Sequence, residues 1–320
     1  MEQLKGENIL FIGGAGFIGS NLIQKFLQKA THKIFVLEPP LANLSRIESV
    51  GNKITIIRGY LSDLDFIQSL IFNNEINRVV HLVSNLIPGS SYVDYLKEFE
   101  HVIFPTLSLM GLCAESGVKF AFFSSGGTVY GNNMGEKFKE SDRLAPISYY
   151  GLSKQVIEDA ILFEHRTKSL DFLIIRPSNP FGPGQSLFAN QGLIAVAIGK
   201  ILSKQPIVIW GNGGSVRDYI YSEDLAESFL QVIEKGISNE IINMGSGLGY
   251  SVNEIITILK RISSENIEIK YEGDRSVDVN RMVLDISKLE SLVTIKPTTI
   301  EDGINVFFQF VKESLNTSAE

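Results

Sequence analysis

The stretch "NILFIGGAGFIG" (residues 8–19) decides the fold of this chain. Its first half is apolar, as in a buried strand, and its second half places Gly13, Gly16 and Gly19 three residues apart. A strand that runs through a glycine turn into a helix brings backbone N–H groups to the helix N-terminus, where a pyrophosphate can bind. The stretch therefore predicts a dinucleotide-binding turn.

The spacing of this turn and the strand that follows indicate which dinucleotide it binds. Ala15 stands where the commoner fingerprint has its second glycine, so the generic motif matches in part, and Phe17 and Ile18 begin the helix that would bind the phosphates. Glu38 ends the next strand, where its carboxylate would accept hydrogen bonds from the adenosine ribose and repel a 2′-phosphate. We expect NAD rather than NADP. The alternative is a turn that only packs a helix on a sheet, with Glu38 solvated.

Strands and helices alternate through the first half of the chain. We predict strands at 8–13, 33–38, 53–59, 78–84, 119–125 and 171–177, and helices at 17–29, 64–73, 99–117 and 149–168. Strands interleaved with helices of this length imply a parallel sheet covered on both faces. The prediction is a doubly wound, Rossmann-type α/β fold.

The pattern changes at the Pro/Gly-rich stretch "PSNPFGPGQ", and mixed strands and helices follow it. We therefore predict a smaller, mixed α/β C-terminal lobe that binds the substrate. The dinucleotide-binding domain would comprise residues 1–176 with roughly 216–243. The substrate lobe would comprise residues 177–215 and 244–320.

Composition excludes several classes of function. The 320 residues carry a net charge of −7, which disfavours binding to nucleic acid or to an anionic membrane. No stretch resembles a membrane span. Cys113 is the single cysteine, so we expect a reducing, cytoplasmic compartment, and the four histidines lack the spacing of metal ligands. We predict no metal.

The stretch "SYYGLSK" (148–154) contains a candidate catalytic pair. If it opens a helix, Tyr150 and Lys154 lie one turn apart on one face, and Tyr149 points away from them. The alternative is two amphipathic side chains on a solvated helix.

Other polar residues follow the predicted strands. Asp63, beside Leu64, could bind an adenine amino group or cap a helix, and both readings stay open. We read His81 as a hydrogen-bonded core residue. Ser124, Ser125 and Thr128 lie where a parallel sheet exposes its ligand crevice.

Together these motifs resemble those of the extended short-chain dehydrogenase/reductases, in the sugar-nucleotide epimerase/dehydratase branch typified by UDP-glucose 4-epimerase. The resemblance covers nearly the whole chain, in order: the glycine turn, Glu38, Asp63, "HLVS", "SSGGTVYG", "YYGLSK", "RPSNPFGPGQ", "VRDYIYSEDLA" and "NMGSG". Each motif alone is weak, and their order makes the resemblance specific.

The resemblance implies a role for each member of the pair. Tyr150 would be the general acid or base at a sugar hydroxyl, and Lys154 would anchor the nicotinamide ribose. The ammonium group and an oxidised nicotinamide would both lower the pKa of the tyrosine toward neutrality. The resemblance also implies a homodimer formed through the helices at 99–117 and 149–168.

The resemblance further implies substrate contacts in the second lobe. Asn179 and Arg217 match residues that meet the sugar diphosphate. Arg275 and Asp278 match a pair that holds phosphate and nucleotide ribose.

The sequence departs from the family at the third catalytic residue. The usual Ser or Thr falls on Gly126, so another hydroxyl must replace it or none is needed. Strand alternation favours Thr128, and Ser125 and Ser84 are alternatives. Dehydratases of this branch place an acidic pair where this chain has Gly127 and Thr128, so dehydration is disfavoured.

We therefore expect an NAD-dependent 4-epimerase of a UDP-hexose. One alternative is a reductase of a nucleotide-linked 4-keto-6-deoxysugar, although such enzymes often prefer NADPH and Glu38 disfavours it. Another is a non-catalytic dinucleotide-binding protein.

Overall fold

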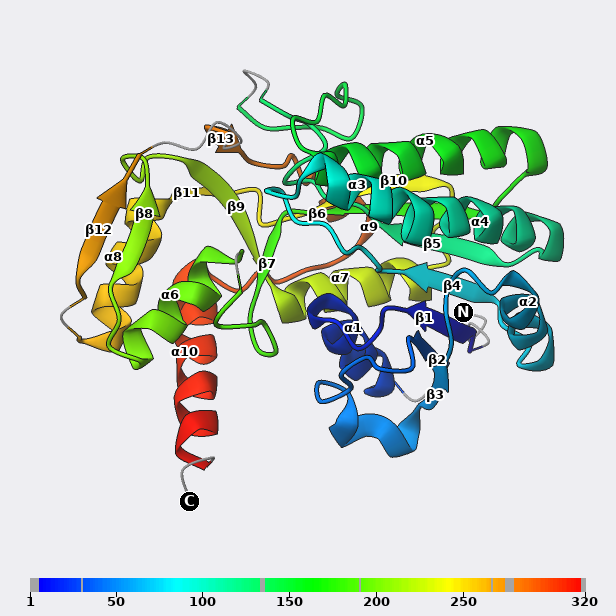
Figure 1. The fold of residues 1–320 in the computed structure, drawn as a ribbon, viewed down its shortest axis with the longest axis horizontal. Helices are drawn as coiled ribbons and strands as arrows, with labels where there is room; N and C mark the ends of the chain where they lie inside the picture. Colours follow the sequence, from blue (N-terminus) through cyan, green and yellow to red (C-terminus); the bar gives the residue numbers. More distant parts are fainter. Residues whose placement is uncertain are drawn as a thin grey trace.

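A parallel sheet forms the larger of two lobes (Figure 1). The computed structural model describes residues 6–29, 31–132, 136–189, 191–265, 267–273 and 279–317, and within them this sheet has seven strands in the order β10-β6-β5-β4-β1-β2-β3. Their bounds are β1 Asn8–Ile12, β2 Lys33–Glu38, β3 Thr55–Arg58, β4 Arg78–His81, β5 Lys119–Phe123, β6 Phe172–Pro177 and β10 Glu240–Met244. The predicted strands and the doubly wound α/β fold are confirmed.

Helices cover both faces of this sheet. They are α1 Phe17–Leu27, α2 Leu64–Asn73, α4 Phe104–Ser116, α5 Tyr149–Lys168 and α7 Ser222–Glu234, with a 3₁₀ turn at Glu48–Lys53. Apolar residues of α1 and α7 pack on one face, and those of α2, α4 and α5 pack on the other. Successive strand residues such as Leu10 and Phe11 enter opposite cores, as alternation along a strand requires.

The predicted helix at 99–117 is interrupted and extended in the structure. A short helix, α3 (Tyr92–Glu98), precedes it, and Phe99–Ile103 is a π-helical turn before α4 begins. Pro105 has no N–H to bond the carbonyl four residues earlier, and the N–H of Phe104 instead bonds the carbonyl of Phe99. The sequence pattern did not predict α3.

The smaller lobe contains its own sheets. In one, β11 (Gly249–Ser251), β9 (Val216–Tyr221) and β13 (Arg281–Met282) lie in that order, and β7 (Asn179–Phe181) pairs with β9; in the other, β8 (Ile207–Trp210) pairs with β12 (Ile269–Glu272). The helices of this part are α6 Leu193–Leu202, α8 Val252–Ser263 and α10 Ile300–Thr317, whereas the short helix α9 (Ser287–Leu292) packs its buried Leu289 into the core of the larger lobe.

The chain returns to the main sheet after its first passage through the smaller lobe, within the stretch predicted as roughly 216–243. There β9 pairs with strands of the smaller lobe, and α7 and β10 pack with the main sheet, as does α9 later in the chain. The exact domain limits stay a prediction.

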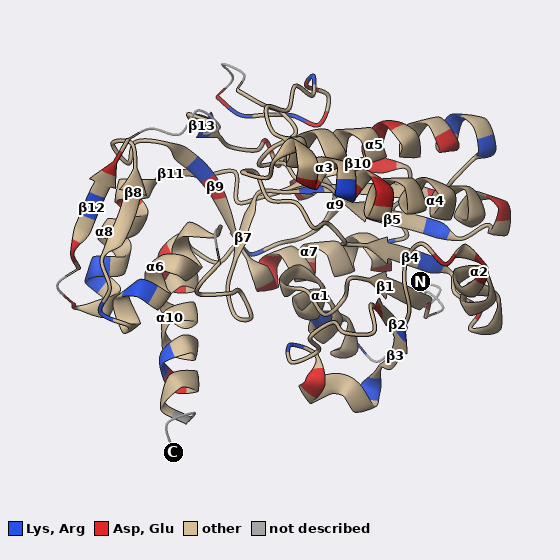
Figure 2. Ribbon diagram, viewed as in Figure 1, with Lys and Arg blue, Asp and Glu red and all other residues tan. Residues whose placement is uncertain are grey.

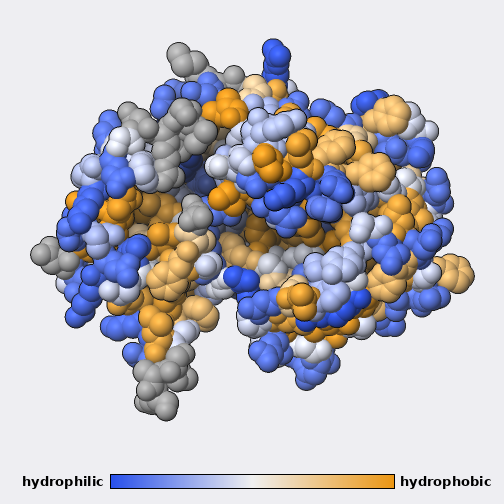
Figure 3. Space-filling view, viewed as in Figure 1, coloured by the Kyte–Doolittle hydropathy of each residue, from blue (hydrophilic) through white to orange (hydrophobic). Residues whose placement is uncertain are grey.

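Charged residues are distributed over both lobes, with Lys and Arg interspersed among Asp and Glu (Figure 2). The space-filling view shows a hollow between the lobes (Figure 3). Among the described residues, no helix combines the length and apolar character needed to cross a bilayer.

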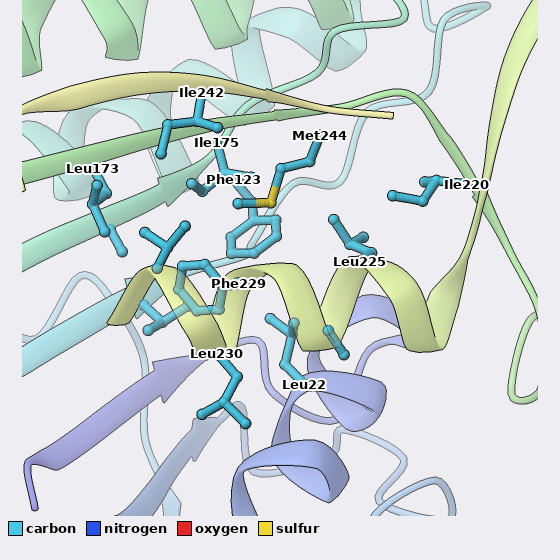
Figure 4. Close-up of a cluster of buried hydrophobic side chains, with 14 of the residues drawn as sticks. Leu22, Phe123, Leu173, Ile175, Ile220, Leu225, Phe229, Leu230, Ile242 and Met244 are labelled. Carbon is cyan, nitrogen blue, oxygen red and sulfur yellow. The ribbon is translucent and has the colours of Figure 1, made fainter. Parts of the chain in front are cut away.

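The core between α7 and the sheet joins strands that are far apart in sequence (Figure 4). Phe229 of α7 and Phe123 of β5 meet edge to face, with ring centroids 5.0 Å apart. Leu22 of α1 and Met244 of β10 belong to the same cluster. This cluster therefore packs α7 and β10, which come late in the sequence, against the earlier elements of the sheet.

We predict that Phe229→Ala lowers the free energy of unfolding by about 3–5 kcal/mol, because the ring is fully buried. Urea denaturation measures the loss. The control is Phe72→Ala on α2, whose side chain is 82% exposed and should change stability by about 0.5 kcal/mol or less. Equal losses in the two variants would contradict this account of the core.

Candidate active site

The glycine turn leads directly from β1 into α1. Gly13 has a φ of +82°, and a Cβ atom at Gly19 would lie 2.6 Å from the carbonyl oxygen of Gly14, so both positions require glycine. Gly16 precedes α1 and offers no side-chain cap to it. The first N–H groups of the helix are therefore open to an anion.

Glu38 lies against this turn. Its Oε1 accepts a 2.6 Å hydrogen bond from the N–H of Ala15, and burial raises the pKa of its carboxyl group. Phe17 and Ile18, in the first turn of α1, are half-buried. These residues fit an NAD molecule whose pyrophosphate meets the helix N-terminus and whose ribose meets Glu38.

Asp63 caps α2 in the structure. Its side chain accepts a 3.1 Å hydrogen bond from the N–H of Phe66, and Leu64 is the first residue of the helix. This is one of the two readings that the sequence left open. Contact with an adenine stays a prediction.

Tyr150 and Lys154 lie one turn apart in α5, as predicted. The Lys154 ammonium lies 5.6 Å from the centre of the Tyr150 ring and donates a 3.1 Å hydrogen bond to the carbonyl of Phe123, at the end of β5. Lys154 is 3% exposed. Tyr149 points elsewhere, with its ring 5.4 Å from that of Tyr95.

The hydroxyl beside Tyr150 belongs to Ser125. A hydrogen bond from Ser125 acts on the Tyr150 hydroxyl, whereas Thr128 Oγ1 is buried without a partner among the described residues. Which of the two hydroxyls is the third catalytic residue stays a prediction. Strand alternation, which favoured Thr128, does not extend that far, because β5 ends at Phe123 and the N–H groups of Thr128 and Val129 bond the carbonyl of Ser125.

Gly126 stands where the family has its Ser or Thr. A Cβ atom there would lie 2.7 Å from Cδ1 of Leu284 and 3.0 Å from the carbonyl oxygen of Arg176. Leu284 is fully buried, so this position faces the core. A Ser or Thr side chain at 126 would therefore clash with the core, so the hydroxyl that the resemblance assigns to this position has to come from another residue or is not needed.

Ser84 is engaged by a carboxylate. Its Oγ donates a 2.8 Å hydrogen bond to Glu98 and accepts one of 3.2 Å from the N–H of Leu86. The second oxygen of Glu98 accepts from the N–H of Asn85 at 3.0 Å. Because its proton is used, Ser84 is poorly placed to donate to a substrate oxygen, and its predicted ligand contacts stay a prediction.

His81 is a core residue, as the sequence indicated. Its side chain is fully buried, and Nε2 lies 2.9 Å from Thr106 Oγ1. Burial, together with the positive charge of Lys154, lowers the pKa of His81 to about 3. The ring is therefore neutral at physiological pH.

A buried ion pair lies one turn beyond Lys154. Glu158 receives a 2.6 Å bond from Arg176 of β6, and Ser124 also donates to this carboxylate. Arg176 also donates a 2.9 Å hydrogen bond to the Tyr130 hydroxyl. That hydroxyl in turn donates a 2.7 Å hydrogen bond to Oδ1 of Asn243. The network ties α5, β6 and β10 together beneath the site.

Burial is the largest influence on the pKa of both Tyr150 and Lys154. It lowers the pKa of Lys154 to about 8, although Glu98 and Glu158 both act in the opposite direction. It also raises the pKa of Tyr150, with Ser125 lowering it and Glu98 raising it further. The groups of the protein that act on Tyr150 therefore leave its pKa above the ordinary value of a tyrosine.

The second-lobe residues are partly described. Asn179 donates a 2.8 Å hydrogen bond to the carbonyl of Asp218, the residue that follows Arg217 on β9. A Cβ atom at Gly127 would lie 3.7 Å from Asn179, which places Asn179 beside the turn after β5. Arg275 and Asp278 lie outside the described residues.

Sequence reasoning missed Glu98 and Glu158. Glu158 had a signal, because it continues the four-residue spacing of Tyr150 and Lys154 within an apolar helix face. Glu98 had none, since "YLKEFE" reads as a solvated, charged segment.

The fold and the site define an NAD-binding enzyme of the short-chain dehydrogenase type. Residues 9–245 match the family model described as "NAD dependent epimerase/dehydratase family". The chain therefore belongs to this family, and the prediction of NAD as cofactor is confirmed at the level of the family.

Individual relatives have different activities. A Methanocaldococcus jannaschii protein, provisionally named a UDP-glucose 4-epimerase, is 30% identical over 97% of this chain and 100% of its own. A dTDP-4-dehydro-6-deoxyglucose reductase of Escherichia coli is 29% identical over 95% and 97%. The crystal structure of the Thermotoga maritima UDP-glucose 4-epimerase with UDP-glucose superposes with a TM-score of 0.89, at 28% identity over 96% and 99%.

We predict that Gly126→Ser lowers the free energy of unfolding by about 1–3 kcal/mol, because the new side chain overpacks the core at Leu284. The matched control is Gly127→Ser, where the nearest atom would be an ordinary contact 3.7 Å away. Chemical denaturation compares the two. If both variants are as stable as the parent protein, position 126 does not face a packed core.

Proposed function

We propose that this protein is an NAD-dependent 4-epimerase of a UDP-hexose. The observation that carries the proposal is the arrangement of three residues at the carboxyl edge of the sheet. Ser125 follows β5, which lies two strands from β1 and its glycine turn, and Tyr150 and Lys154 lie in the first turns of α5. In an α/β sheet this edge is where the ligands meet. The relatives that act on UDP-glucose support the choice of sugar nucleotide.

The chain's own residues would move the proton. Tyr150 would take the proton of the sugar 4-hydroxyl, and Ser125 would hold that hydroxyl in line with the phenol. Lys154 would keep its ammonium group near the phenolate and the nicotinamide ribose. The glycine turn and Glu38 would hold NAD, which when bound would supply hydride transfer at C4 of the sugar. No carboxylate occupies positions 124–130, which disfavours elimination of water.

The second lobe would hold the nucleotide. Asn179 and Arg217 would bind the diphosphate, and Arg275 with Asp278 would bind phosphate and nucleotide ribose. The hollow between the lobes supports this arrangement. A cytoplasmic location also remains our expectation.

Proton NMR of the purified protein with UDP-glucose, and separately with UDP-N-acetylglucosamine, tests the proposal without added coenzyme. We expect the anomeric signal of the corresponding 4-epimer, because NAD is regenerated in each turnover. Absence of both signals, also after NAD is added, would reject epimerisation of these sugars.

We further predict that Ser125→Ala lowers kcat by about 10²-fold, because it removes the hydroxyl that acts on Tyr150. Thr128→Val should cost much less, and Tyr150→Phe should abolish turnover. The same NMR assay gives the rates. A larger loss for Thr128→Val than for Ser125→Ala would reverse the assignment of the third catalytic residue.

A reductase of a nucleotide-linked 4-keto-6-deoxysugar is the second candidate. The Escherichia coli relative that matches nearly the whole chain favours it. The same tyrosine would then deliver a proton to the 4-keto oxygen once per turnover. Stoichiometric loss of NADH absorbance with such a substrate would identify this activity.

We also propose a homodimer. Large apolar side chains are exposed on α3, α4 and α5, and Figure 3 has apolar colour gathered over these elements. They include Leu96, Phe99, Phe104 and Phe163, which are 49%, 44%, 60% and 54% exposed. An exposed apolar patch of this kind favours a protein partner.

Phe104→Asp should therefore convert a dimer into a monomer, because the interface would bury an unpaired charge. Light scattering after size exclusion gives the mass. Phe72→Asp, on an 82% exposed residue of α2, is the control and should leave the mass unchanged. A monomeric parent protein would refute the interface.

A further inference from the structure

Glu98 is a buried carboxylate that the proposed mechanism does not use, in a helix that packs on the start of α5. The rings of Tyr92 and Tyr95 on α3 lie 5.9 and 5.4 Å from that of Tyr149, the residue before Tyr150. Glu98 ends α3, just before the π-helical turn, and is 2% exposed. Its oxygens accept hydrogen bonds from the hydroxyl of Ser84 and the N–H of Asn85, in the loop after β4. Irregular π turns are common at functional sites, and buried carboxylates require a compensating charge or donors.

The donors to Glu98 are neutral. Among the described residues it forms no ion pair, whereas Glu158, the other carboxylate that acts on Lys154, is paired with Arg176 at 2.6 Å. The Lys154 ammonium itself bonds a neutral carbonyl, that of Phe123. Lys154 and Glu98 are thus two buried groups of opposite sign, near the ends of the adjacent strands β5 and β4, and neither forms an ion pair among the described residues.

We propose that Glu98 is a positioning residue. It fixes the loop after β4, and its negative charge influences the pH at which Tyr150 and Lys154 ionise. Its low exposure and its bonds to Ser84 and Asn85 remove it from direct contact with a sugar. It acts through the pair and not on the substrate. The inference rests on the proposed role of Tyr150 as the group that loses a proton.

The direction of this effect follows from the charges around the pair. Glu98 raises the pKa of both Tyr150 and Lys154. Glu158, paired with Arg176, also raises the pKa of Lys154, and His81 is neutral. Removing the charge of Glu98 should therefore shift ionisation of both members of the pair to lower pH.

Glu98→Gln removes the charge and keeps the shape of the side chain. The ionisation of Tyr150 is measured by the tyrosinate absorbance of each protein minus that of the same protein carrying Tyr150→Phe, over a pH series with NAD bound. We expect Tyr150 to ionise at a lower pH in Glu98→Gln than in the parent protein. In Glu98→Asp, which retains the negative charge, we expect Tyr150 to ionise at nearly the same pH as in the parent protein.

The matched control is Glu100→Gln, two residues away, where the side chain is 75% exposed and solvent screens its charge. It should leave the titration unchanged. Superimposed curves for the parent protein and Glu98→Gln, or a shift to higher pH, would overturn the proposal even if thermal unfolding shows a loss of stability. The titration needs no nucleotide sugar, so failure of the epimerase assay leaves its result intact.

Discussion

The buried ion pair between Glu158 and Arg176 is the constraint on which the site depends. Both side chains are 3% exposed or less, and removing one partner from such a pair typically costs about 3–5 kcal/mol. Glu158 shares a face of α5 with Tyr150 and Lys154, so its bond to β6 fixes the rotation of the helix about its axis. The orientation of Tyr150 and Lys154 therefore depends on a buried contact between α5 and β6.

Much of the fold follows from local pattern. Apolar runs alternate with amphipathic ones at βαβ spacing, and a right-handed crossover leaves few ways to order the strands. The glycine turn could be predicted because its positions carry a backbone requirement, which only glycine meets at Gly13 and Gly19. The pairing of Tyr150 with Lys154 followed from helical spacing alone.

Other parts of the site depend on long-range packing that no local pattern encodes. Alternation could not reveal that β5 ends at Phe123, so it selected Thr128 over Ser125. Leu284 leaves no space for a side chain at Gly126, and it lies more than 150 residues later in the sequence. Glu98 belongs to a segment whose charge predicts solvation, and tertiary structure buries it instead.

The place of β10 in the main sheet affects how the chain can be made. A growing polypeptide that has completed β6 still lacks β10 and α7, because the first elements of the smaller lobe are synthesised between them. Until residue 244 has left the ribosome, β6 presents an open edge and an uncovered apolar face, the features that promote misassembly. The sheet of the larger lobe is therefore completed only after the first elements of the smaller lobe have been synthesised, so the two lobes cannot fold strictly one after the other during translation.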